Sequence, residues 1–242
     1  MKVRIHRGAH EIGGNCIEVD AGGARIVLDV GRPLAALPTD VVPLPDIPGL
    51  DDGNDKSLLG LFISHGHQDH WGLISQVSPK VPVYMGEASS SILREAAFFT
   101  RAGYDIKTAG FLQHRTPLTL GPFLITPYLN DHAGFDTYSL LIEAGGRRLF
   151  YTADFEGHGR KAAIFEELLR KPPKDVDVML MEGTNIKEDD APGDELSERD
   201  VENAMVAEFR SAPAMTLILY SAQNMDRLVT IYRAAKRAGK TL

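Results

Sequence analysis

The chain has 242 residues, which is enough for one large domain or two small ones. Its hydrophobic content of 43% and charged content of 24% are ordinary for a globular protein. No apolar run approaches the roughly 20 residues that span a bilayer, and the N-terminal stretch has neither a signal core nor a cleavage site. The single cysteine, Cys16, excludes an internal disulfide framework. We therefore expect a cytoplasmic protein that does not associate with membranes.

The first part of the chain is rich in predicted strands. Alternating or continuous apolar runs predict strands at 3–6, 16–19, 25–30, 59–64, 81–85, 123–129, 137–143 and 147–152. Helical patterns occur at 71–77, 87–102 and 160–170. Residues 33–56 carry five prolines and no clear period, so they are expected to form a long loop of the functional or mobile kind.

The order of elements changes after about residue 175. A buried strand at 177–181 is followed by a helix at 197–210, where Ser197 and Asp200 have the spacing of a capping box. A strand at 216–220 and an amphipathic helix at 223–238 come next. This strand–helix alternation favours a parallel α/β unit, so we expect a domain change near 175–197, with the acidic stretch 188–195 as the linker.

The stretch SHGHQDHWG, residues 64–72, directly follows a predicted strand. His65, His67 and Asp69 are spaced i, i+2 and i+4, so in an extended loop they point the same way, and His70 follows as a helix begins. A polar surface loop gains little from clustering histidines. One ion can hardly use all four side chains of so short a segment, whereas two adjacent ions can share them. Imidazole and carboxylate ligands suit zinc, and also manganese or iron.

Further candidate ligands lie at the ends of later strands. His132 follows the strand at 123–129, and Asp154 follows the strand at 147–152. Alone, each has a plainer interpretation, as a structural histidine and a turn aspartate. Because strand ends gathered at one edge of a sheet make a natural active-site rim, both become candidate ligands beside the histidine cluster.

The sequence HGHQDH matches the HxHxDH signature of the metallo-β-lactamase superfamily, and the chain is identified as a member on this pattern. The resemblance implies an αββα sandwich, which we place at residues 1–195. It implies two metal ions, zinc first and manganese as the alternative, with a metal-bound hydroxide that attacks a carbonyl carbon or phosphorus. Asp29, in LDVG, is expected to orient the loop through hydrogen bonds. The implied ligands are His65, His67 and His132 for one ion, Asp69 and His70 for the other, and Asp154 as the bridge.

Other stretches resemble ribonuclease J and related RNA-processing nucleases. The stretch GAHEIGGNC, residues 8–16, is similar to their N-terminal motif, and MEGTN, residues 181–185, places Glu182 as an acidic residue at a strand end. The segments 197–212 and 221–228 resemble the start of the β-CASP domain, which we place at 196–242. The resemblance implies a hydrolase that cleaves single-stranded RNA, with Asp69 and Glu182 as catalytic residues.

Several alternatives stay open from the residues alone. The helix at 197–210 is an ordinary amphipathic helix by its period, Glu182 has the plainer role of a cap or salt-bridge partner, and His158 that of a loop histidine. The net charge of −7 counts against RNA. A small-molecule hydrolase acting on a thioester, lactone or cyclic phosphodiester is the second hypothesis, and a scaffold without catalysis is the third. The second metal site of this branch uses a histidine later than any here, so we expect a longer complete protein; whether it forms a homodimer is left open.

Overall fold

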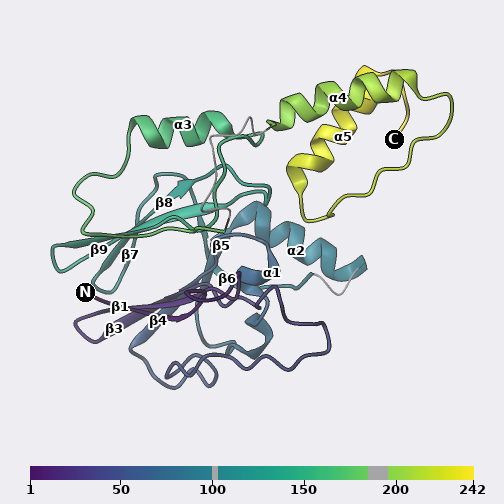
Figure 1. Cartoon of the computed structure of the whole chain (residues 1–242). Helices are drawn as coiled ribbons and strands as arrows, with labels where there is room; N and C mark the ends of the chain where they lie inside the picture. The colour runs from purple at the N-terminus through teal and green to yellow at the C-terminus, as the bar shows by residue number, and fades with distance from the viewer. Residues whose placement is uncertain (100–102, 185–195) are drawn as a thin grey trace. The chain divides into compact units, whose positions relative to one another are not determined.

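The computed structural model describes residues 1–99, 103–184 and 196–242 (Figure 1). These residues form two compact units. The first unit contains residues 1–129, 136–154 and 173–182, and the second takes the remaining segments, 130–135, 155–172 and the described part of 183–242.

The first unit is built on two β-sheets (Figure 1). In the six-stranded sheet the spatial order follows the sequence, and β1 to β3 are antiparallel whereas β3 to β6 are parallel. Its strands are β1 (Lys2–Arg7), β2 (Cys16–Ala21), β3 (Ala24–Leu28), β4 (Leu58–Phe62), β5 (Val83–Gly86) and β6 (Thr108–Leu112). The five-stranded sheet has the order β11-β10-β9-β8-β7, and only its β10–β11 pair is parallel. Its strands are β7 (Leu118–Leu120), β8 (Phe123–Leu129), β9 (Tyr138–Ala144), β10 (Arg147–Tyr151) and β11 (Val178–Leu180).

Two apolar cores flank the six-stranded sheet. One core lies between the sheets, where Leu28 and Phe62 meet Phe123 and Leu140, all fully buried. The other core covers the opposite face of the first sheet and includes residues of the helices α1 (Gln68–Trp71) and α2 (Glu87–Phe99) and of the 3-10 turn Ile74–Gln76. Parallel strands buried on both faces account for the nearly continuous apolar sequences of β3 and β4. The expected metallo-β-lactamase αββα fold is confirmed.

The strand directions bring chain segments distant in sequence to one edge. The register pairs Leu28 with Phe62, so β3 and β4 end side by side. Asp29 and the histidine loop therefore start from neighbouring positions. The N–H of Tyr138, at the start of β9, donates to the Ser64 carbonyl at 3.0 Å and ties the second sheet to the same edge.

The described residues of the second unit form three helices, α3 (Ala162–Arg170), α4 (Glu198–Ser211) and α5 (Met225–Arg237). The predicted capping box of α4 is confirmed: Ser197 accepts from the backbone N–H of Asp200, whose side chain accepts from Ser197 in return. An apolar seam joins α4 and α5. It consists of Val206, Phe209, Ala234 and Ala235, with Met205, Ile218 and Ala238 beside it.

The structure differs from the predicted elements at residues 216–220 and at β6 and β7. The strand predicted at 216–220 was wrong, since these residues form no strand and Leu217 and Leu219 are exposed. A strand requires a partner for its backbone groups, and no described segment pairs with this one. The short strands β6 and β7 were not predicted. The domain boundary expected at residue 195 falls at the end of 185–195, outside the described residues, and stays a prediction.

No helix in the described part of the chain combines the length and apolar character required to cross a membrane.

Candidate metal centre

Asp29 is the fixed point of the site. It follows β3 in a left-handed conformation, with φ of 58°, and is completely buried. Its Oδ1 accepts from the Ser64 N–H at 2.7 Å. Its Oδ2 accepts from the Ser64 hydroxyl at 2.9 Å and from the Tyr151 hydroxyl at 2.6 Å, and lies 2.8 Å from His70 Nδ1. A buried carboxylate with this many donors joins β3, the histidine loop and the second sheet.

The backbone of the histidine loop is held from several sides. The N–H of Val30 donates to the His70 carbonyl at 2.8 Å, and the N–H of Asn15 donates to the Asp69 carbonyl at 3.2 Å. Gly31 lies against the backbone of Asp69, and a Cβ at this glycine would be 1.6 Å from the Asp69 carbonyl oxygen. Trp71 donates from Nε1 to the Gly66 carbonyl at 2.9 Å. Protein groups on several sides therefore fix the backbone of the loop.

A first ligand group faces the end of β10. One ligand atom each of His65, His67 and Asp154 lie within 4.8 Å of one another. His65 is fully buried, and its Nε2 is 3.9 Å from Asp154 Oδ2. Imidazole nitrogens and a carboxylate oxygen gathered at this separation are a donor set that fits a divalent transition-metal ion.

A second ligand group shares Asp154 with the first. It consists of Asp69, His70 and Asp154. His70 Nε2 lies 3.1 Å from Asp154 Oδ1 and 3.6 Å from Asp69 Oδ2. The two oxygens of Asp154 thus face different groups, Oδ2 toward His65 and Oδ1 toward His70. A carboxylate with this placement is suited to bridge two ions.

Hydrogen bonding sets the role of each His70 nitrogen. When Nδ1 donates to Asp29, the lone pair of the neutral ring lies on Nε2, the atom that faces Asp69 and Asp154. Burial of the ring disfavours its charged form, but the carboxylates of Asp29 and Asp154 outweigh it and raise the pKa of His70 well above its usual value. Burial also raises the pKa of Asp69, against the opposing effect of His70. A cation in the second group would take the place of the His70 proton.

His132 follows β8 in the segment 130–135, which clusters with the second unit. Neighbours within that unit hold this segment, because Lys161 Nζ donates to the His132 carbonyl at 3.0 Å and the Met225 N–H donates to the Ala133 carbonyl at 3.0 Å. The expected role of His132 as a metal ligand stays a prediction.

Glu182 follows β11, the strand beside β10. Its N–H donates to the Thr152 hydroxyl at 3.4 Å, and the pairing of Tyr151 with Leu180 brings it to the same sheet edge as Asp154. Its carboxylate belongs to neither ligand group of the first unit. A catalytic role for Glu182 and for Asp69 stays a prediction.

Sequence reasoning missed the residues that support the ligands. Tyr151 lies inside an apolar strand and carries no motif, yet its hydroxyl contacts Asp29, and burial with that carboxylate raises its pKa well above the usual value. Asn15 was seen only within a motif, but its Nδ2 lies 3.2 Å from His70 Nε2. Ser64, the first residue of the quoted stretch, is the main hydrogen-bond partner of Asp29.

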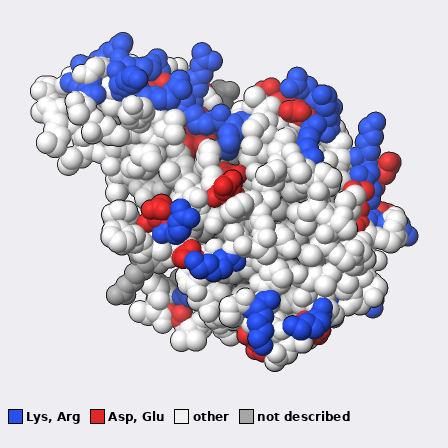
Figure 2. Space-filling view, turned by 180° about the vertical axis from the view of Figure 1, so that it is seen from behind, with Lys and Arg blue, Asp and Glu red and all other residues white. Residues whose placement is uncertain are grey.

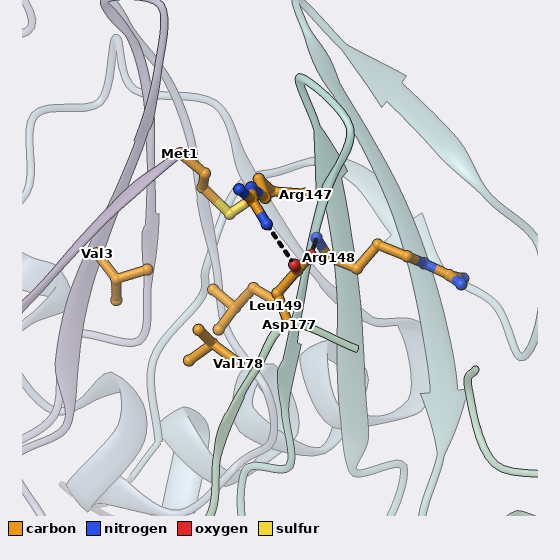
Figure 3. A pocket seen from close by; sticks show the side chains of 7 residues that line it. All are labelled: Met1, Val3, Arg147, Arg148, Leu149, Asp177 and Val178. Atoms are coloured by element: carbon orange, nitrogen blue, oxygen red, sulfur yellow. Dashed lines mark hydrogen bonds and ion pairs between the residues drawn. The ribbon is translucent and has the colours of Figure 1, made fainter. Parts of the chain in front are cut away.

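A hollow of about 350 Å³ occurs at the opposite edge of the first unit (Figure 3). It lies at the starts of β1, β10 and β11. Both arginines that line it form ion pairs: Arg147 donates to Asp177 at 2.8 Å, and Arg148 lies 3.0 Å from Glu143. None of the candidate ligands is among the residues that line it.

Comparison with known proteins places this geometry in a family. A model of the beta-lactamase superfamily domain matches residues 39–220. Ribonuclease J of Helicobacter pylori strain 26695 is 25% identical over 238 residues, covering 94% of this chain and 34% of that protein. Ribonuclease J of Mycobacterium tuberculosis strain H37Rv is 24% identical over 253 residues, covering 99% and 43%. Cleavage and polyadenylation specificity factor 73 of Drosophila melanogaster is 26% identical over 207 residues, covering 76% and 28%. The chain therefore spans less than half the length of each of these relatives.

Solved structures agree on the fold. A protein of unknown function from Enterococcus faecalis V583 superimposes with a TM-score of 0.77 at 23% identity, covering 98% of this chain and 66% of that one. The metallo-β-lactamase MIM-1 from Novosphingobium pentaromativorans gives a TM-score of 0.50 at 16% identity, covering 93% and 84%. At these identities, the likeness concerns the fold alone.

Proposed function

This chain belongs to the beta-lactamase superfamily, and on that premise we propose that it is a metal-dependent phosphodiesterase that cleaves single-stranded RNA. The observation that carries the proposal is the pair of ligand groups sharing Asp154. The similarity to ribonuclease J over 94% or more of the chain supports RNA as the substrate.

We assign the ligands as the motif implies. His65, His67 and His132 would hold one ion, Asp69 and His70 the other, and Asp154 would contact both. Zinc fits this mixture of imidazole and carboxylate, and manganese is the alternative. When bound, such ions lower the pKa of a water molecule toward about 7 and stabilise negative charge on phosphoryl oxygens.

The chain's own residues supply orientation and proton handling. Asp29 fixes the His70 ring through Nδ1, and Ser64 and Tyr151 hold Asp29 in turn. Of the proposed catalytic residues, Asp69 would supply a carboxylate to the second ion, and Glu182 would transfer a proton to the leaving oxygen.

The net charge of −7 favours the second candidate, a small-molecule hydrolase that opens a thioester, lactone or cyclic phosphodiester.

Cleavage of end-labelled single-stranded RNA by the chain loaded with zinc or manganese tests the proposal. Asp69→Asn is the active-site variant, and Asp51→Asn, at an exposed loop position, is the matched control. We expect the unmodified chain and the control to cut RNA, and Asp69→Asn to be at least 100-fold slower, the loss typical of removing one essential catalytic group. Intact RNA both with the metal-loaded chain and with a longer form that supplies the expected later histidine would overturn the proposal, and turnover of a thioester or lactone in the same preparations would establish the second candidate.

A further inference from the structure

The exposed side of α5 concentrates positive charge in an otherwise acidic chain. Residues 225–240 contain five basic residues and one acidic residue, whereas the whole chain carries −7. Figure 2 shows lysine and arginine side chains gathered over α4 and α5. The local charge is therefore opposite in sign to the net charge that counts against RNA.

Three basic residues share one side of the helix, and a fourth follows its end. Arg233, Lys236 and Arg237 are spaced i, i+3 and i+4 in α5, Lys240 lies three residues beyond the helix, and all four are exposed. Tyr232, which is 54% exposed, stands beside them. The opposite side of the helix packs against α4 through Ala234 and Ala235, which are buried. The helix thus has its apolar face covered and its basic face open.

A buried carboxylate organises the arginines. Glu202 on α4 is only 3% exposed, and it contacts Arg160 Nη2 at 2.7 Å, Arg233 Nε at 3.0 Å and Arg237 Nη1 at 2.7 Å. Burial alone would raise the pKa of Glu202, but Arg237 and Arg160 overcome that effect and hold the pKa below its usual value. Three guanidinium groups share one carboxylate, so two positive charges remain in excess. Each of Arg233 and Arg237 uses only part of its five N–H donors on Glu202.

We propose that the basic surface formed by Tyr232, Arg233, Lys236 and Arg237 of α5, together with Lys240 after the helix end, binds the phosphate backbone of single-stranded RNA. The inference rests on the proposed function for its choice of ligand. Arginine donors held in place by Glu202 lose less side-chain entropy on meeting a phosphate. Tyr232 supplies an aromatic ring on which a base can stack.

The composition of the face argues against a purely structural role and against membrane binding. Cations in the last helical turn stabilise any helix, but Arg233 lies a turn earlier and Lys240 beyond the end. An anionic membrane also attracts a basic helix, but membrane helices insert an apolar face. That face of α5 is buried on α4. The surface is positively charged and does not expose the apolar face of α5, so it is complementary to the phosphate backbone of a nucleic acid rather than to a membrane.

Binding of a fluorescent oligouridine to the metal-free 242-residue chain, followed by anisotropy across a salt series, tests the inference without cleavage. The variant Lys236→Gln/Lys240→Gln leaves the Glu202 contacts intact, and Arg233→Gln/Arg237→Gln removes two of them while Arg160 remains. The control Arg94→Gln/Lys107→Gln changes the charge equally on exposed residues of the first unit. Urea unfolding of every variant checks that the fold is retained.

Each lost phosphate contact should make the negative slope of log affinity against log salt shallower by about 0.7. We expect each helix double variant to make this slope shallower by about 1.4 and to bind RNA roughly 25-fold more weakly than the unmodified chain at 0.1 M salt. The affinity of the control should stay within about twofold of that of the unmodified chain. Equal binding by the helix variants and the control would overturn the inference and leave the proposed function standing. If the unmodified chain neither binds nor cleaves RNA, the proposed function itself fails, and the inference with it. Binding to phosphatidylserine vesicles that requires Lys236 and Lys240, without RNA binding, would assign the face to membranes instead.

Discussion

The Nδ1 atom of His70 lies 2.8 Å from the Oδ2 atom of Asp29, although 41 residues separate them in sequence. Both side chains are completely buried. This contact selects which nitrogen of His70 faces Asp69 and Asp154, and so links the end of β3 to the chemistry of the site.

Replacing Asp29 by Asn should destabilise the fold and impair the second ligand group. Asn has one acceptor oxygen where the carboxylate has two, and its amide N–H would face the Ser64 and Tyr151 donors. We expect a loss of about 3 kcal/mol in the free energy of unfolding, measured with urea. Tyr151→Phe removes one of these hydrogen bonds without adding a donor and should cost only about 1.5 kcal/mol. Equal losses in the two variants would contradict this account.

Gly31 and Gly66 differ in whether the structure leaves room for a side chain. A Cβ at Gly31 would meet the Asp69 carbonyl oxygen at 1.6 Å, whereas a Cβ at Gly66 has no neighbour closer than 3.9 Å. Gly31→Ala should therefore displace the ligand loop and lower the free energy of unfolding by more than about 4 kcal/mol, while Gly66→Ala should change it by less than about 1 kcal/mol. Thermal unfolding of both variants measures the difference. A stable Gly31→Ala protein would show that the backbone there can move apart.

Trp71, the only tryptophan, should report metal binding. Its indole donates to the Gly66 carbonyl, between His65 and His67, so ordering of these ligands changes its surroundings. Adding zinc to the metal-free chain should change the tryptophan emission and raise the melting temperature, with a stabilisation of about 4 kcal/mol at 1,000 times the dissociation constant. EDTA should reverse both effects, and His67→Ala should weaken them. If the emission and melting temperature are indifferent to zinc and manganese, the candidate centre does not bind them.

The fold should lose stability in acid partly through Glu18. Burial opposes ionisation of this carboxyl, but Arg25 at 2.8 Å and His6 at 3.0 Å lower its pKa below the usual value. A lowered pKa in the folded state contributes stability above the unfolded value of about 4.3, and the contribution is lost as the pH falls through the folded value. Glu18→Gln should therefore lower the free energy of unfolding by about 3 kcal/mol at pH 7. The loss should become smaller as the pH falls below about 4.3.

Urea midpoints for Glu18→Gln and for Asp20→Asn, a neighbour on the same strand, would be compared from neutral pH into acid. A Glu18→Gln deficit that stays constant across this range would show that the lost contact is not the ionic one.

Local patterns and motifs were enough to predict several features of this chain. The i, i+2, i+4 spacing of His65, His67 and Asp69 indicated a metal loop, and Ser197 with Asp200 predicted the start of α4. Continuous apolar runs marked the buried strands β3 and β4 because both faces of a parallel strand are covered. These features are readable because each is decided by residues a few positions apart.

Other features depend on contacts between residues that are distant in sequence. Only the folded chain shows that Tyr151 and Ser64 hold Asp29, and that Glu202 gathers three arginines, since these partners come from different elements and carry no shared motif. The error at 216–220 has the same origin: TLILY has the composition of a strand, but a strand forms only where another segment satisfies its backbone groups. Local propensity is a property of the sequence, whereas burial, pairing and charge balance depend on which neighbours the fold supplies.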